Sequence, residues 1–157
     1  MKVKTILVPL DGSTLAEGAL TRAAELAVEA DARIVVVRAV HAAFSTGDPI
    51  DAQVKVIAEA ERYLNDVTER LRTLGVKDTR PSVWYGMAAS AIIDAAAIHH
   101  ADLIVMMSHG RSGIGRFVMG SVAESVLRGT TTPILLLRDH RAPVEVPVGT
   151  AIVSCPS

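Results

Sequence analysis

The sequence lacks several features that define large classes of protein. Its 157 residues include one cysteine, Cys155, near the end of the chain. One thiol cannot build a disulfide framework or a site with several cysteine ligands, and this usage is typical of a reducing compartment. The cysteine count therefore predicts a cytoplasmic protein whose core forms without cross-links.

Aromatic residues and surplus positive charge are also scarce. Phe, Tyr and Trp make up 3% of the chain, although half of its residues are hydrophobic. Platforms for single-stranded nucleic acid need aromatic rings on which bases stack. The 16 Lys and Arg residues are balanced by 17 Asp and Glu residues, so no basic excess is available for a nucleic-acid backbone or an anionic membrane. We expect neither as a partner.

Long hydrophobic runs are absent. No run approaches the roughly 20 apolar residues that a membrane-spanning helix needs. The first apolar run, residues 6–8, meets Pro9 and then Asp11, which is too early for the hydrophobic region of a signal peptide. At roughly 100–200 residues per domain, the length predicts a single domain.

Five short aliphatic runs, rich in β-branched residues, recur along the chain. They are nearly continuous and do not alternate apolar with polar residues, which is typical of strands buried on both faces of a parallel sheet. The predicted strands are residues 5–9, 33–40, 80–85, 102–107 and 134–138.

The segments between these strands have helical spacing. The predicted helices are residues 15–30, 88–98 and 121–128, together with a second helix whose apolar stripe consists of Val54, Ile57, Leu64, Val67, Leu71 and Leu74. Gly75 and Gly129 stand where the second and fourth helices should end. The sequence therefore predicts an α/β fold, a doubly wound five-stranded parallel sheet in the order 3-2-1-4-5 with helices on both faces.

Two helix starts carry a capping signal. Thr14 with Glu17, and Ser121 with Glu124, match the capping box in which Ser or Thr precedes Glu by three residues. We assign residues 1–138 to the domain and residues 139–157 to a C-terminal tail. Prolines punctuate that tail, and Val144 to Val153 could form a short strand pair or no ordered structure.

A glycine-rich segment follows the fourth predicted strand. It contains Gly110, Gly113, Gly115 and Gly120 and ends at the start of a helix. Uncovered main-chain N–H groups and a helix N-terminus both attract phosphate, and Arg111 adds a cation. A flexible connection before an ordinary capped helix would also explain the segment. A P-loop is excluded because residues 108–121 contain no lysine.

Asp11 lies just beyond the first predicted strand. Ligands of doubly wound sheets bind at the carboxyl ends of strands, where neighbouring connections run to opposite faces. In the predicted strand order, Asp11 and the segment from Gly110 to Ser121 would face each other across such a crevice. The alternative is an Asx turn, in which the Asp11 carboxylate binds its own backbone.

These motifs together resemble a known family. They are Ile6-Leu7-Val8-Pro9-Leu10-Asp11-Gly12-Ser13, Ala101-Asp102-Leu103-Ile104-Val105-Met106, Ser108-His109-Gly110-Arg111-Ser112-Gly113, Gly120-Ser121-Val122-Ala123-Glu124 and Pro133-Ile134-Leu135-Leu136-Leu137. From Ile6 to Arg138 the chain resembles the universal stress protein family. The ATP-binding branch of that family carries Gly-x2-Gly-x9-Gly-Ser/Thr. Here Gly110, Gly120 and Ser121 match, and Met107 replaces the first glycine. Its side chain could crowd the ribose or could point away.

The resemblance implies that the protein binds ATP, with Mg²⁺ held largely by the phosphates. The residues that it assigns to the nucleotide are Pro9, Leu10, Asp11, Ala39, Met107, His109, Gly110, Arg111, Gly120, Ser121 and Val122. In this assignment Asp11 contacts the adenosine end, Pro9 and Leu10 line the base, the Ala39 backbone binds the adenine edge, and the residues from His109 onward surround the phosphates. Relatives are homodimers joined along the last strand, here Ile134 to Leu137.

Other reactive residues are set aside. His99 and His100 are adjacent at the end of a helix and are expected to be solvated cations, and no residue is a good catalytic candidate. The leading hypothesis is an ATP-binding stress-response regulator that is not an enzyme, with at most slow hydrolysis. The alternatives are an ATP-independent dimeric scaffold, in which Met107 has closed the pocket, and an adenylating enzyme. The adenylating enzyme ranks last because residues 9–13 are not a Ser-Gly-Gly-rich loop.

Overall fold

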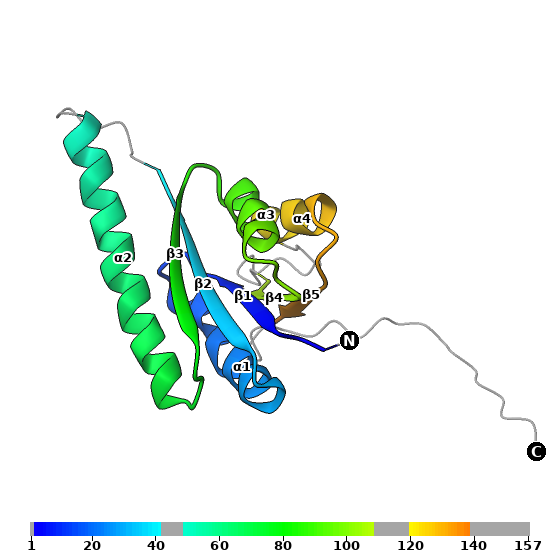
Figure 1. The fold of residues 1–157 in the computed structure, drawn as a ribbon. Helices are drawn as coiled ribbons and strands as arrows, with labels where there is room; N and C mark the ends of the chain where they lie inside the picture. The colour runs from blue at the N-terminus through cyan, green and yellow to red at the C-terminus, as the bar shows by residue number, and fades with distance from the viewer. Residues whose placement is uncertain (1, 42–48, 109–119, 139–157) are drawn as a thin grey trace, which may run out of the picture.

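A computed structural model describes residues 2–41, 49–108 and 120–138 of the chain (Figure 1). The elements, in order, are β1 (Thr5–Pro9), α1 (Thr14–Ala30), β2 (Arg33–Val40), α2 (Pro49–Thr73), β3 (Thr79–Tyr85), α3 (Ala88–Ile98), β4 (Leu103–Met107), α4 (Ser121–Gly129) and β5 (Ile134–Leu137). Every predicted strand and helix is therefore present, and the bounds differ from the predicted ones by few residues.

The five strands form one sheet in the order β3-β2-β1-β4-β5, with every pair parallel. The predicted fold class and strand order are thus confirmed. β1 is central: Leu7 is paired with Val35 of β2 on one side and with Ile104 of β4 on the other. β3 and β5 are the two edges.

Helices cover both faces of the sheet (Figure 1). Alternate strand residues such as Ile6 and Val36 pack on one face against α1 and α2, whose contributions include several alanines and Leu64. The intervening residues, such as Leu7 and Val35, pack on the other face against α3 and α4. Strands buried on both faces explain the continuous hydrophobic runs in the sequence.

The amino end of β4 is tied to β1 by a side chain. One carboxylate oxygen of Asp102 accepts N–H groups from both Lys4 and Thr5, at 2.8 and 2.9 Å. These two backbone hydrogen bonds hold the pKa of Asp102 below its usual value. Asp102 was predicted to be a strand residue, but its side chain fixes the start of the strand pair and β4 begins at Leu103.

The C-terminal turn of α2 is closed by Gly75, the residue at which the sequence predicted the helix to stop. The N–H of Gly75 donates to the Arg72 carbonyl and the N–H of Val76 to the Leu71 carbonyl, and Gly75 has a φ of 95°. This pattern is the Schellman motif, which needs a left-handed residue. Among the described residues, none of the helices combines the length and the apolar character needed to span a bilayer.

Gly75→Ala should destabilise the protein because a Cβ disfavours the left-handed conformation by about 1–2 kcal/mol. Space does not limit this substitution, since an added Cβ would meet its nearest heavy atom, in Val28, at 3.5 Å. The matched control is Gly18→Ala inside α1, which should be neutral or stabilising by up to about 1 kcal/mol. Urea denaturation measures both. Equal effects of the two substitutions would contradict this account of the α2 terminus.

Candidate nucleotide site at the carboxyl rim of the sheet

The centre of the sheet has the topology at which doubly wound sheets bind ligands. β1 and β4 are paired neighbours. α1, which follows β1, packs on one face of the sheet, and α4, which follows β4, packs on the other. Adjacent strands whose connections leave toward opposite faces open a crevice at their carboxyl ends. The adjacency of β1 and β4 on which the sequence prediction depended is confirmed.

The turn after β1 is held by Asp11. Its Oδ1 accepts the N–H of Ser13 at 2.8 Å, and Gly12 between them has a φ of 86°. This is the Asx turn that the sequence left open as an alternative. The Leu10 N–H also donates to the Val37 carbonyl at 2.8 Å, so the turn is attached to β2. Asp11 remains exposed at the rim.

The N-terminus of α1 differs from the prediction. Ser13 is the N-cap, and its Oγ accepts the N–H of Ala16 at 3.1 Å. The predicted cap, Thr14, is wrong by one residue because the left-handed Gly12 places Ser13 in the extended conformation that an N-cap adopts. The predicted partner Glu17 accepts hydrogen bonds from Tyr63 and Arg70.

Arg38 of β2 packs against the Asp11 turn. Its Nη2, Cζ and Nη1 atoms lie 3.3, 3.4 and 3.5 Å from the point that a Cβ on Gly12 would occupy. The Cζ also lies 4.9 Å from the centre of the Tyr63 ring on α2, a cation–π contact. The guanidinium thus bridges the turn and α2, and a side chain at position 12 would be in tight contact with it.

A polar network continues from Tyr63. Its hydroxyl donates to Glu17 Oε1 at 2.8 Å, and Arg70 donates to Glu17 Oε2 at 2.9 Å. The Arg70 hydrogen bond lowers the pKa of Glu17, while burial, followed by the bond to Glu17, raises the pKa of the Tyr63 phenol. Glu17 is therefore an anion at neutral pH that connects the first turns of α1 to α2.

Met107, at the end of β4, points into the core. It is 8% exposed and belongs to the cluster on the α1 face of the sheet. Its Sδ lies 3.4 Å from the point that a Cβ on Gly18 of α1 would occupy, so the thioether packs against this part of α1. Of the two orientations that the sequence left open, the described side chain is packed between β4 and α1.

The start of α4 also differs from the prediction. Gly120 is the N-cap and makes no side-chain cap bond, whereas Ser121 is the first helical residue and is exposed. The predicted Ser121–Glu124 capping box is wrong, because Glu124 instead accepts Arg128 at 2.8 Å one turn later. The Ser121 hydroxyl is therefore not needed to begin the helix.

The other predicted site residues fall into two groups. Pro9, Leu10, Ala39 and Val122 lie near the ends of β1 and β2 or in the first turn of α4, and Leu10 is buried while the others are half-buried. His109, Gly110 and Arg111 lie outside the described residues, as do Gly113 and Gly115.

Comparisons with known proteins agree with this fold. The model of the universal stress protein family matches residues 2–138. A universal stress protein of Staphylococcus aureus strain USA300 is 33% identical over 146 residues, which cover 90% of this chain and 88% of that protein. The chain belongs to the universal stress protein family.

Solved structures of the universal stress protein family superpose closely. A family member from Burkholderia pseudomallei is 34% identical, with a TM-score of 0.69 over 87% of this chain and 96% of that one. A universal stress protein in complex with cAMP is 25% identical, with a TM-score of 0.65 over 88% of this chain and 98% of that one. The family match ends at Arg138, so residues 139–157 lie outside it.

Sequence analysis did not identify the contacts that Arg38 makes with the turn after β1 and with Tyr63. The available signal was a charged residue inside the otherwise apolar run of residues 34–40. Its partner Tyr63 was not identifiable, because Tyr63 lies on α2, 25 residues further along the chain. Among the described residues, no group of three or more His, Cys, Asp or Glu side chains could hold a metal ion.

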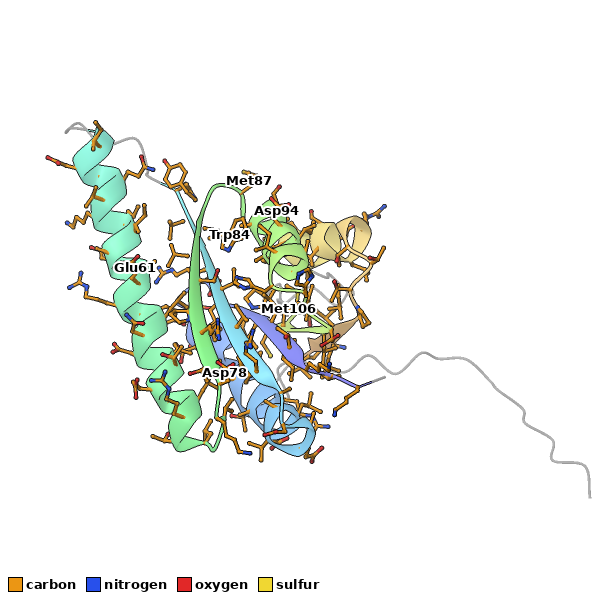
Figure 2. The ribbon with its side chains drawn as sticks, viewed as in Figure 1. Glu61, Asp78, Trp84, Met87, Asp94 and Met106 are labelled. Atoms are coloured by element: carbon orange, nitrogen blue, oxygen red, sulfur yellow. The ribbon has the colours of Figure 1, made fainter. Side chains whose placement is uncertain are left out.

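A second polar cluster lies on the α3 side of the sheet, where Figure 2 labels Trp84. The Trp84 indole donates to Ser82 Oγ at 2.9 Å, and that oxygen lies 3.1 Å from Nε2 of His99. Burial, and then the charges of Arg33 and Arg80, lower the pKa of His99. The expectation that His99 is a solvated cation is wrong, because α3 ends with this ring against β3.

Stability should fall as the pH is lowered from about 7.5 to about 5, because unfolded histidine titrates near pH 6.5 and binds more protons than His99 does in the fold. The contribution of His99 is present above that pH and is lost below it. His99→Gln should flatten this dependence, and the exposed neighbour His100→Gln should not. Urea denaturation across the pH range measures the slopes, and parallel slopes for the parent and His99→Gln would refute the assignment.

Proposed function

We propose that this universal stress protein is an ATP-binding regulator in which the nucleotide, with Mg²⁺, lies across the rim between the β1–α1 turn and the start of α4. The observation that carries the proposal is the pairing of β1 with β4 while their helices cover opposite faces. In that arrangement, the β1–α1 turn and the start of α4 would lie on opposite sides of one crevice.

The residues at the rim fit an adenine nucleotide. Asp11 is exposed beside β2 and would contact the ribose, with Pro9, Leu10 and the Ala39 backbone toward the base. At the other end, α4 begins without a side-chain cap at Gly120, so its first N–H groups and the helix dipole favour phosphate. Ser121 would add a hydroxyl there.

The assignments of His109, Gly110 and Arg111 rest on the family resemblance alone, as does the assignment of Mg²⁺. The three residues would complete the phosphate contacts, and the phosphates themselves would hold most of the Mg²⁺ coordination. The relative solved with cAMP supports the adenine-nucleotide class, since it is 25% identical over 88% of this chain.

The competing function is an ATP-independent scaffold in which Met107 blocks the ribose. The described position of Met107 favours ATP binding, because the side chain fills the space beside Gly18 in the core and leaves its backbone at the rim. The adenylating enzyme is disfavoured because the β1–α1 turn is a short Asx turn with one glycine.

We further propose that occupancy is the signal and that the protein is cytoplasmic. We expect hydrolysis to be slow at most, since the sequence offers no good catalytic candidate. The family resemblance also predicts a homodimer through β5, a strand at the edge of the sheet whose four side chains are all half-buried. Apolar edge strands of this kind tend to be covered.

Protein purified from cells and denatured in acid should release adenine nucleotide near one equivalent, and Mg-ATP should bind the emptied protein in calorimetry. Asp11→Asn supplies an amide oxygen that can accept the Asx-turn hydrogen bond but removes the charge, so affinity should fall roughly 10- to 100-fold, the equivalent of a charged hydrogen bond. Ser121→Ala should weaken binding about fivefold. The control is Ser125→Ala, which is also exposed on α4. A parent protein that releases no nucleotide and gives no heat with Mg-ATP would favour the ATP-independent scaffold.

Met107→Ala separates the two functions directly. Loss of a buried methionine should lower the free energy of unfolding by about 2–5 kcal/mol, yet ATP affinity should not improve. The matched control is Met106→Ala, since Met106 is similarly buried but faces α3 and α4 (Figure 2). If Met107→Ala alone gained ATP affinity, the thioether would be an obstacle and the scaffold hypothesis would stand.

A further inference from the structure

A groove of about 370 Å³ lies between α2 and β3, at the edge of the sheet opposite to β5. α2 and β3 run in opposite directions, so the start of α2 and the end of β3 are at the same end of the molecule (Figure 1). One wall of the groove is a face of the helix and the other is the outermost strand. Three residues of each element line it: Ile57, Glu61, Asn65, Pro81, Val83 and Tyr85.

The backbone groups of β3 point alternately toward β2 and toward the edge of the sheet. The N–H of Ile34 in β2 donates to the Asp78 carbonyl at 2.9 Å. At the other end of the strand, the Gly86 N–H donates to the Val40 carbonyl at 2.8 Å. The even-numbered residues of β3 are therefore bonded to β2. The N–H and C=O groups of Val83 point the other way, toward the side on which no described strand pairs with β3.

The position of Pro81 agrees with this alternation. Pro81 has the same parity as Val83, so its missing N–H lies on the outer side and breaks no hydrogen bond to β2. The outer side of an edge strand presents backbone groups to which another extended chain can bond. Val83 thus offers an N–H and a C=O to an added strand, and Pro81 offers a C=O.

The groove is apolar at one end and acidic in the middle. Tyr85 is 53% exposed, and Val54, three residues before Ile57 on α2, is 61% exposed. Exposed apolar residues that gather in one place mark binding surfaces. Glu61, which Figure 2 labels on α2, is the one charged side chain among the six lining residues, and none of the described ion pairs involves it. The occupant that fits these walls carries an apolar group next to a cation.

The spacing of the two ends matches an extended peptide. Ile57 and Glu61 are four residues apart on α2, which is about 6 Å along the helix. Alternate side chains of a strand lie about 6.8 Å apart and point to the same face. In a peptide antiparallel to β3, the residue opposite Tyr85 would therefore lie toward Ile57. The residue opposite Val83, two positions later, would lie toward Glu61.

A second copy of the chain fits this edge less well than a basic peptide does. Two β3 strands paired antiparallel around Val83 would bring two α2 helices together, and with them two Glu61 carboxylates. Like charges placed opposite each other destabilise a strand pair. A Lys or Arg side chain at the same place would instead neutralise Glu61.

We propose that this groove binds an extended peptide of a partner protein as an antiparallel strand on β3, with an apolar side chain opposite Tyr85 and Lys or Arg opposite Val83. Backbone hydrogen bonds to Val83 and Pro81 give the affinity, and the Glu61 carboxylate selects the basic residue. The groove lies at the β3 edge, so this inference does not depend on nucleotide binding at the rim between β1 and β4.

Titration of the full chain with capped heptapeptides, followed by NMR, tests the proposal. The probe is Thr-Thr-Val-Thr-Lys-Thr-Thr, and the matched peptide has Glu in place of Lys. The Lys peptide should shift the Val83 amide resonance and slow the hydrogen exchange of that amide. It should also bind at least about fivefold more tightly than the Glu peptide, the equivalent of one ion pair.

Two variants separate the charge from the backbone. Glu61→Lys should reverse the preference between the peptides. Glu59→Lys, the same change at an exposed α2 residue that does not line the groove, should leave it unchanged. Val83→Pro removes the outward N–H and no bond to β2, so the Lys peptide should bind at least about fivefold more weakly. Urea denaturation checks that each variant is folded.

Three results would overturn the proposal. If millimolar Lys peptide shifted no amide of β3, the groove would take no strand. If both peptides bound equally to the parent and to Glu61→Lys, the carboxylate would select nothing. If the Val83 resonance shifted with protein concentration in the absence of peptide, a second copy of the chain would be the occupant.

Discussion

The pairing of β1 with β4 is the interaction on which the rest of this structure depends. β1 has a partner on each side, and Ile6, Leu7 and Val8 are fully buried between the two helical layers. A strand in this position cannot slip by one residue without turning its side chains to the wrong faces. The pairing therefore fixes where β1 and β4 end, and with them the position of the Asp11 turn relative to α4.

The same alternation explains the position of the Met107 side chain at the end of β4. Val105 and Met107 face α1, whereas Ile104 and Met106 face α3 and α4. The orientation of Met107 is thus set by strand parity, and its sulfur packs beside Gly18 of α1. A bulky side chain at this position consequently fills the core and need not enter the crevice at the rim.

Polar contacts connect the candidate site to the second helix. Arg38 lies between Gly12 and Tyr63, and Tyr63 shares the Glu17 carboxylate with Arg70. These contacts join β2, α2, α1 and the turn that carries Asp11. Gly12 has a left-handed backbone, and Arg38 packs directly over it, so the turn and the guanidinium are in contact.

Local patterns in the sequence determined the elements and the parallel sheet, since runs such as residues 34–37 are apolar enough to be buried on both faces. The strand order followed from the usual order of doubly wound sheets, and the tertiary structure confirmed it. Side-chain partners were decided only in the tertiary structure. The residues at Thr14 and Ser121 have the spacing of capping boxes. In the structure, however, the N-cap of α1 is Ser13, which follows a left-handed glycine, and the N-cap of α4 is Gly120. His99 lies against Ser82 of the preceding strand, β3, and burial there lowers the pKa of its ring. Periodicity and composition act along the chain, whereas hydrogen-bond partners and burial depend on residues that only folding brings together.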